Sequence, residues 1–592
     1  METVNTVSLG IPVNVLENRT AAICIRNEVP YLVMAAKGLV LSVNLDNHHV
    51  NQLDFPDQVK GEYPYDSCSD GSGLFYTAAG NTILVFDPDE NSWFDMQKHP
   101  LHSEEIAGIS MTASLKNVYF SSYPGTYLSQ YDPQYKKLTI LDQLDETEMY
   151  TGSMAVCKDG WIYAGIGTQR KDLVAYHPEK SGKYTFIKDD ERTTGYGLIF
   201  QTIDGKVYGS DDANHEEANW FSLSDGKCTR IEQPKKLKLS TQGSGFHRIK
   251  NAHLLDKKVT YSLPSKRFTI NDQTYSLDYE STGADLSPVT KYNGHVIGTS
   301  NHPLRLFSFK GKFMVYPEQT IKYGGGGNIC TYTQWGDALY GAAYAGGHIH
   351  KLLQQPDGRL AVDYLASVPQ IYRPRASAIL NDQSCIVFGG FGAYGTVGGG
   401  LAILDPITEK IDVWENHDLV QGQSVIALSP YEKDYVVAGT SVETPGGAKP
   451  ITNTAAILLL DIKSKKILDR MPLKGIREIV QLSICEQGFL HIVTSCSLYI
   501  VWDLKNKKEM YRENLQQYGH IVREGMIKRK ENRFVLVFSK AIIEVTDTNI
   551  KLLYPLKQEA TMGGTIINIH LYYASGTALH RLPLEKDLSC IV

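Results

Sequence analysis

The chain has 592 residues, of which 42% are hydrophobic and 21% charged, a composition that excludes a disordered or fibrous protein. The formal net charge of −6 at pH 7 excludes a surface that coats nucleic acid, because phosphate neutralisation needs a clustered excess of Lys and Arg. No stretch approaches the length of a membrane-spanning apolar segment, so we expect no membrane partner.

The cysteines and the N-terminus bear on location. Nine cysteines are scattered along the chain without a C-x-x-C pair, and residues 1–10 lack the basic and apolar segments of a secretory signal. We therefore expect free thiols and a cytoplasmic location.

A repeat begins in the first half of the chain. Tyr76, Tyr119, Tyr163 and Tyr208 each end a short β-rich run, and successive members are 43, 44 and 45 residues apart. No segment shows sustained helical periodicity. A period of this length indicates one small β unit per repeat.

One unit can be divided into strands. We expect strands at residues 153–157, 161–165, 173–176 and 184–188, with a hairpin turn at Asp159-Gly160 between the first two. Four strands within about 43 residues make one blade of a β-propeller.

A second marker follows the third strand of many units: an apolar pair and then Asp-Pro or a related dipeptide. Because Asp bonds its own backbone and Pro lacks a donor, each dipeptide closes a strand and starts a turn. The marker residues are Asp87, Asp132, His177, Asp405, Asp461 and Asp503.

The repeat predicts an all-β protein of four-stranded propeller blades. The chain length divided by the period gives about fourteen units, whereas typical rings hold about four to eight blades. We therefore expect two tandem propellers, residues 1–280 and residues 281–592, with the boundary near an irregular segment at residues 235–281. One ring with large insertions is the alternative.

Loops in the second half carry the unusual residues. In a propeller, the loops that follow second strands and those that precede first strands emerge on the same face. Here they carry a glycine-rich segment at residues 389–400, which no blade needs for closure. The candidate site residues are His302, Arg305, Tyr344, His348, His350, Arg373, Arg375, Tyr394, Gln423 and Glu443.

Arg373 and Arg375 flank a proline at the start of a strand, so alternation directs both side chains to one face, where they can bind a carboxylate. The alternative is a pair of inter-blade salt bridges. His348 and His350 also share a strand face and could act as a base or hold a divalent metal. The alternative for these histidines is packing between blades, and no other cofactor is indicated.

Three segments of the second half carry a family resemblance: Arg373-Pro374-Arg375-Ala376, residues 394–400 and residues 439–442. With them the chain resembles bacterial propeller proteins of carbohydrate loci, and its architecture is similar to that of propeller-type polysaccharide lyases that act on uronate-containing glycans. The resemblance implies an anionic oligosaccharide or polysaccharide partner and cleavage by β-elimination.

Such an elimination needs a cation for the uronate carboxylate, a base for the α proton and an acid for the leaving oxygen. The candidates in these three roles are Arg373 or Arg375, His348 or His350, and Tyr344 or Tyr394.

The residues leave open whether the protein is an enzyme. The main alternative is a non-catalytic propeller scaffold, which would show an exposed apolar patch instead of a pocket lined by His and Arg. A quinone-dependent dehydrogenase is weaker, because the recurring tryptophans of that class are missing among only six.

Overall fold

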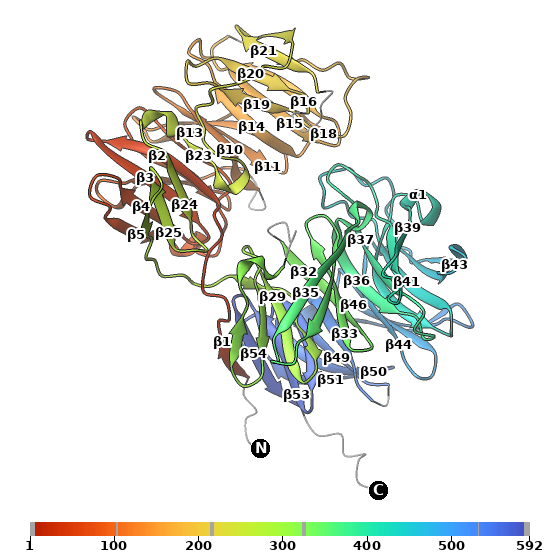
Figure 1. Cartoon of the computed structure of the whole chain (residues 1–592). Helices are drawn as coiled ribbons and strands as arrows, with labels where there is room; N and C mark the ends of the chain where they lie inside the picture. The colour runs from red at the N-terminus through yellow and green to blue at the C-terminus, as the bar shows by residue number, and fades with distance from the viewer. Residues whose placement is uncertain are drawn as a thin grey trace. The chain divides into compact units, whose positions relative to one another are not determined.

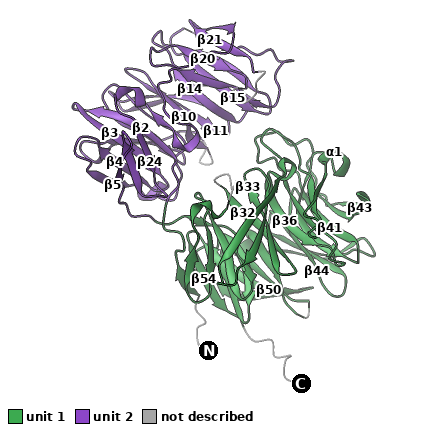
Figure 2. Cartoon of the chain, in the orientation of Figure 1, with its two compact units in different colours: residues 1–15, 282–592 green, residues 16–281 purple. Residues whose placement is uncertain are grey.

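The computed structural model describes residues 6–101, 105–180, 182–212, 218–321, 327–530 and 532–584. Nearly all regular structure in these residues is β, arranged in four-stranded sheets (Figure 1). The chain divides into two compact units: unit 1 contains residues 1–15 and 282–592, and unit 2 contains residues 16–281 (Figure 2). The predicted all-β tandem propeller is confirmed.

Unit 2 contains six sheets among its described residues. In chain order they are β2 (Thr20–Arg26), β3 (Val29–Ala36), β4 (Leu39–Asn44) and β5 (Val50–Asp54); β6 (Ser67–Ser69), β7 (Phe75–Ala79), β8 (Thr82–Asp87) and β9 (Ser92–Lys98); β10 (Ile106–Ala113), β11 (Val118–Tyr123), β12 (Tyr127–Asp132) and β13 (Lys137–Gln143); β14 (Tyr150–Val156), β15 (Ile162–Thr168), β16 (Asp172–His177) and β17 (Gly182–Thr185), with β18 (Gly195–Tyr196) on β15; β19 (Leu198–Gln201), β20 (Val207–Ser210), β21 (Trp220–Ser224) and β22 (Lys227–Ile231); and β24 (Val259–Ser262), β25 (Arg267–Ile270) and β26 (Gln273–Ser276).

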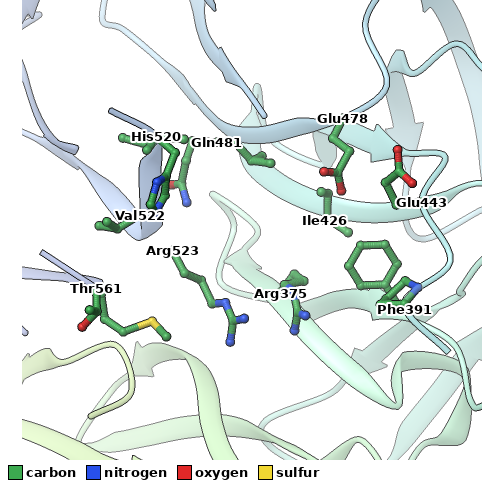
Figure 3. Close-up of a pocket in the computed structure, with 14 residues that line it drawn as sticks. Arg375, Phe391, Ile426, Glu443, Glu478, Gln481, His520, Val522, Arg523 and Thr561 are labelled. Atoms are coloured by element: carbon green, nitrogen blue, oxygen red, sulfur yellow. The ribbon is translucent and has the colours of Figure 1, made fainter. Parts of the chain in front are cut away.

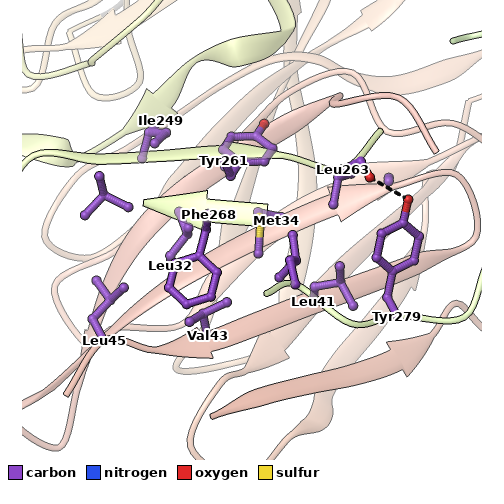
Figure 4. Packing of buried hydrophobic residues seen from close by; sticks show 14 of the residues in the cluster. Leu32, Met34, Leu41, Val43, Leu45, Ile249, Tyr261, Leu263, Phe268 and Tyr279 are labelled. Carbon is purple, nitrogen blue, oxygen red and sulfur yellow. Dashed lines mark hydrogen bonds between the residues drawn. The ribbon is translucent and has the colours of Figure 1, made fainter. Parts of the chain in front are cut away.

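The last sheet of unit 2 packs against the first. Leu32 and Leu41 of the first sheet are fully or almost fully buried in one core with Phe268 of the last, and Tyr279 donates a hydrogen bond to the Leu263 carbonyl oxygen at 2.9 Å (Figure 4). Between these sheets, strand β23 (Ile249–Lys250) runs parallel to β2. The irregular segment predicted at residues 235–281 therefore closes the unit.

Unit 1 contains seven blades among its described residues. They are β28 (Thr290–Tyr292), β29 (His295–Asn301), β30 (Leu306–Phe309) and β31 (Phe313–Val315), with β27 (Asp285–Leu286) on β29; β32 (Asn328–Trp335), β33 (Ala338–Tyr344), β34 (His348–Gln354) and β35 (Leu360–Ser367); β36 (Arg373–Ile379), β37 (Ile386–Phe391), β38 (Leu401–Leu404) and β39 (Ile411–Trp414); β40 (Ser424–Tyr431), β41 (Tyr435–Ser441), β42 (Ala456–Asp461) and β43 (Lys466–Pro472); β44 (Ile479–Ile484), β45 (Phe489–Thr494), β46 (Leu498–Asp503) and β47 (Lys508–Asn514); β48 (Ile521–Lys528), β49 (Phe534–Phe538), β50 (Ala541–Thr546) and β51 (Asn549–Pro555); and β52 (Met562–Ile567), β53 (His570–Ser575), β54 (Ala578–Pro583) and β1 (Val7–Gly10).

The N-terminal strand completes the last blade of unit 1. Strand β1 pairs antiparallel with β54, so the outer strand of that blade comes from the other end of the chain. The first strands β32, β36, β40, β44, β48 and β52 contact one another in sequence, β52 contacts β28, and β29 of that blade contacts β32. These contacts close the ring around a central channel.

Short helices occupy some loops, and they are α1 (Asn416–Leu419), η1 (Asp57–Val59), η2 (Gly245–His247), η3 (Ala252–Leu254), η4 (Glu318–Thr320), η5 (Pro369–Ile371) and η6 (Gln516–Tyr518). Within the described ranges, no helix has the length and apolarity to cross a membrane. The eight described cysteines are free thiols, and Cys590 lies outside the described residues.

The turn marker of the repeat works as predicted. The Asp132 carboxylate accepts a hydrogen bond from the backbone N–H of Gln134 at 2.9 Å, and Asp405 does the same for Ile407 at 2.9 Å. In the blade where His replaces Asp, His177 Nδ1 accepts a hydrogen bond from the backbone N–H of Glu179 at 3.1 Å. In all three blades the side chain thus holds the turn between the third and fourth strands.

Candidate functional site

A cavity of about 450 Å³ opens in the channel of unit 1. Its walls come from the first strands β36, β40, β44, β48 and β52 with the residues just before them, from the end of β37 and from the loop that follows β41. The lining residues used below are Arg375, Phe391, Glu443, Glu478, Gln481, His520, Arg523 and Thr561 (Figure 3). Five neighbouring blades therefore contribute to one site.

Two guanidinium groups face this cavity. Arg375 and Arg523 occupy the third position of β36 and of β48, so equivalent blade positions direct both side chains inward (Figure 3). Neither forms an ion pair with any described residue; the Arg375 guanidinium donates only to the Pro374 carbonyl oxygen, at 2.9 Å. Burial, reinforced by the charge of Arg523, lowers the pKa of Arg375 to about 9. The site therefore carries positive charge that the described residues leave without a direct counter-ion.

Two carboxylates line the opposite wall, and each has a partner of its own. Glu478 accepts a hydrogen bond from Ser441 Oγ at 2.7 Å, and burial raises the pKa of Glu478. Glu443 forms an ion pair with Arg477 at 2.5 Å. Glu478 acts on Arg375 electrostatically, but the two groups make no direct ion pair. The cavity thus has a cationic side and a side of engaged carboxylates.

Of the residues predicted from the sequence, Arg375 and Glu443 line this cavity. Sequence reasoning missed Arg523, Glu478 and His520. A signal for Arg523 was present: it follows an inter-blade loop and stands at the same strand position as Arg375. The glycine-rich loops drew attention to earlier blades instead.

Arg373 lies in a different environment from Arg375. The predicted common face is lost because the pairing of β36 with β37 shifts register between Pro374 and Ala376. The Arg373 guanidinium carbon lies 5.3, 5.6 and 4.2 Å from the ring centres of Tyr344, Tyr372 and Tyr394. Cation–π contacts in a buried site stabilise the charge. Arg373 is therefore part of a packed cluster.

The predicted acids belong to that cluster. The hydroxyl groups of Tyr344 and Tyr394 lie 3.0 Å apart, and burial, with the neighbouring Tyr394, raises the pKa of Tyr344. Neither tyrosine lines the cavity. A raised pKa makes the Tyr344 phenol a weaker proton donor, and the geometry places both hydroxyl groups away from the channel cavity.

His348 and His350 lie on β34, the third strand of its blade, outside the cavity lining. Their ring centres are 6.5 Å apart, and Tyr364 lies 5.8 and 5.9 Å from them. His350 is fully buried, and burial lowers the pKa of His348. Neither histidine belongs to a group of three potential metal ligands within the described part of the chain. Third strands lie away from the channel axis, which explains the separation from Arg375.

The remaining predicted residues have structural partners. Arg305 is buried and pairs with Glu318 at 2.9 Å, and His302 lies between β29 and β30, outside the cavity. Gln423 is buried; its amide donates to the Thr454 carbonyl oxygen at 2.9 Å and accepts from Thr440 Oγ1 at 2.5 Å. Gln423 thus joins two loops.

The glycine-rich segment at residues 389–400 is explained by packing of backbone against backbone. A Cβ atom on Gly399 would lie 2.1 Å from the Gly390 carbonyl oxygen, and one on Gly390 would lie 2.4 Å from that of Arg373. No side chain larger than hydrogen fits at these two positions.

Glu524, which follows Arg523 on β48, gives the stability of unit 1 a testable pH dependence. Burial raises the pKa of Glu524 to about 7, although Thr331 and Arg523 oppose the shift. The pKa of Glu524 in the folded state exceeds the usual 4.5. The free energy of unfolding is therefore greatest below that value, and it falls as pH rises through about 7, because the unfolded chain gives up the proton first. We expect Glu524→Gln to raise the free energy of unfolding of unit 1 by about 1–3 kcal/mol near pH 8 and little near pH 5.

Urea unfolding at the two pH values measures this difference. The exposed Glu486→Gln, in the same unit, is the control and should give the same small change at both. An equal effect of Glu524→Gln at both pH values would contradict a raised pKa.

Similarity to known proteins is found at the level of the fold. No family model and no curated protein sequence matches the chain. Among solved structures, the extracellular domain of the putative one-component system BT4673 from B. thetaiotaomicron is similar, at 12% identity and a TM-score of 0.36 over 96% of this chain and 69% of that one.

Two further structures are similar. PorZ, a surface component of the type-IX secretion system of Porphyromonas gingivalis, matches at 11% identity and a TM-score of 0.39, over 97% of this chain and 86% of that one. The Dos1 propeller matches at 14% identity and a TM-score of 0.39, over 55% of this chain and 92% of that one. Likenesses of this degree do not extend to function, and the propeller fold rests on the sheets described above.

The expected cytoplasmic location is corrected at this point. Four of the similar structures are extracellular domains or a bacterial surface component, which points away from the cytoplasm. The scattered free cysteines are compatible with more than one compartment, so they were a weak basis for that expectation. No other location follows from structural likeness of this degree.

Proposed function

We propose that unit 1 is a recognition propeller for carboxylate-bearing ligands, with uronate-containing glycans as the ligand class. One observation carries the proposal: Arg375 and Arg523 face one cavity without an ion-pair partner among the described residues. Guanidinium groups match the geometry of a carboxylate and bind it through paired hydrogen bonds. A bound carboxylate would also relieve the repulsion between the two cations.

The rest of the cavity suits a sugar ring. Gln481, His520 and Thr561 offer donors and acceptors for hydroxyl groups, and Phe391 offers an apolar surface. A volume of about 450 Å³ is within the range of small-ligand sites. This charged lining favours ligand recognition over the apolar contact patch expected of a pure scaffold.

The finer proposal is β-elimination of the bound uronate. Arg375 and Arg523 would neutralise the carboxylate, and His520 would remove the α proton because its imidazole lines the same cavity. The electron pair of that C–H bond would form the new C=C bond as the C–O bond to the leaving sugar breaks, and the protonated His520 imidazole would pass the proton to the leaving oxygen. His348 and His350 are not used in this scheme, since they lie outside the cavity. Glycan recognition without turnover is the alternative, and both share the arginine pair.

Calorimetric titration tests recognition. Oligouronates should bind, while neutral oligosaccharides of the same length should not, and raising the salt concentration should weaken binding because the attraction is electrostatic. Equal binding of the neutral glycans would contradict the proposal. An increase in ultraviolet absorbance from an unsaturated uronate during the same incubation would identify the lyase, and binding without that increase would identify a non-catalytic recognition module.

A further inference from the structure

A second group of chemically active side chains lies at the other ends of the unit 1 strands. Cys485 follows the end of β44, and Asp547 occupies the turn between β50 and β51. His491 is the third residue of β45. The Sγ, imidazole nitrogen and carboxylate oxygen atoms of these residues all lie within 4.8 Å of one another. Two adjacent blades therefore bring a thiol, an imidazole and a carboxylate together.

The hydrogen bond between His491 Nδ1 and Tyr499 orients the other ring nitrogen toward this group. Its Nδ1 lies 2.7 Å from the Tyr499 hydroxyl, and its Nε2 lies 3.4 Å from Asp547 Oδ1. His491 is fully buried, and neither Nε2 nor Asp547 Oδ1 has a hydrogen-bond partner among the described residues. In the tautomer that carries its proton on Nδ1, His491 donates to the Tyr499 hydroxyl, and the Nε2 lone pair then faces a carboxylate oxygen, an arrangement that favours a cation between them.

We propose that Cys485, His491 and Asp547 form a binding site for a divalent transition metal, with Zn²⁺ as the preferred ion. Thiolate, imidazole and carboxylate are the three ligand types that Zn²⁺ takes in proteins, and three protein ligands leave a fourth position for water. Tyr499 would hold the ligating imidazole by its other nitrogen, as outer partners of metal-bound histidines do.

The surroundings are compatible with closure on a metal. Cys485 is buried, whereas the Asp547 side chain is 42% exposed at a two-residue turn. The buried pair fixes two ligands, and the turn can bring the third inward by the small distance that tetrahedral coordination requires. The bound metal would join the blade of β44–β47 to the blade of β48–β51. This site is separate from the channel cavity and does not depend on the proposed glycan recognition.

Cobalt titration of the full-length, reduced and chelator-treated protein tests the site. We expect one equivalent of Co²⁺ to produce a thiolate-to-cobalt charge-transfer band with intense visible bands of a four-coordinate ion, and Zn²⁺ to abolish both. Cys485→Ser should remove the charge-transfer band. Asp547→Asn should weaken Co²⁺ binding while keeping that band. Tyr499→Phe should weaken Co²⁺ binding by about tenfold.

Cys385→Ser is the matched control, because Cys385 is also a buried thiol in the turn between the first and second strands of a blade, but lies outside the group of three. It should keep the full cobalt spectrum. Circular dichroism of each variant shows that it folds. A wild-type protein that gives no charge-transfer band would overturn the proposal and leave an ordinary hydrogen-bonded chain of Tyr499, His491 and Asp547. A band that survives Cys485→Ser, or unchanged affinity in folded Asp547→Asn, would also overturn it.

Discussion

Replacing Arg375 or Arg523 with Met should weaken oligouronate binding by roughly 30- to 1000-fold, which corresponds to about 2–4 kcal/mol. Each substitution removes one guanidinium from the carboxylate and leaves a side chain of similar length. The double variant should not bind measurably. Calorimetric titration with the same oligouronate measures all three proteins.

The Arg375→Met variant should not lose stability. Burial and the charge of Arg523 lower the pKa of Arg375, so the folded protein disfavours the charged form of this side chain. Removal of the Arg375 guanidinium should therefore leave the melting temperature of unit 1 unchanged or higher. Arg512→Met is the control, because Arg512 lies on the outer strand β47 and already pairs with Glu509. It should bind normally. An Arg375→Met protein that melts far lower while binding oligouronates normally would make Arg375 a structural residue.

The strands of a blade could be predicted from the sequence because the local signals are strong. The first strand expected at residues 153–157 is β14 (Tyr150–Val156), and the fourth, expected at residues 184–188, is β17 (Gly182–Thr185). The hairpin turn predicted at Asp159-Gly160 is present, and the Asp159 carboxylate accepts a hydrogen bond from the N–H of Trp161 at 3.2 Å. Boundaries shifted by a few residues because pairing partners, not composition, decide where a strand ends.

The channel site could be predicted only in part, because its residues come from five blades. Which of them face the channel also depends on the register of strand pairing, which the local sequence pattern does not specify. Arg375 was found from its place after an inter-blade loop, while Arg373, two residues earlier, was assigned to the same face. The register shift at Pro374 separates them, and such an irregularity has no clear local signal. The pairing of β1 with β54 was equally hidden, since the repeat period does not say which ring a single strand joins.

The closing core of unit 2 leads to the largest expected loss of stability. Phe268 of β25 is fully buried between the last and first sheets (Figure 4). The centre of its ring lies 5.2 Å from that of Tyr275, on which it stacks. We expect Phe268→Ala to lower the free energy of unfolding of unit 2 by about 3–5 kcal/mol, since it removes buried apolar surface and leaves a cavity. Differential scanning calorimetry should show one transition shifted down and the other unchanged.

Two controls connect this loss to the closing core. Tyr135→Ala removes an aromatic ring that is 73% exposed in the same unit, and it should leave both transitions in place. Oligouronate binding by the Phe268→Ala protein should equal that of the wild type, because Arg375 and Arg523 belong to unit 1. If the unit 2 transition kept its temperature in Phe268→Ala, the last sheet would not close this propeller, since a ring held by that core cannot lose its central aromatic side chain without cost.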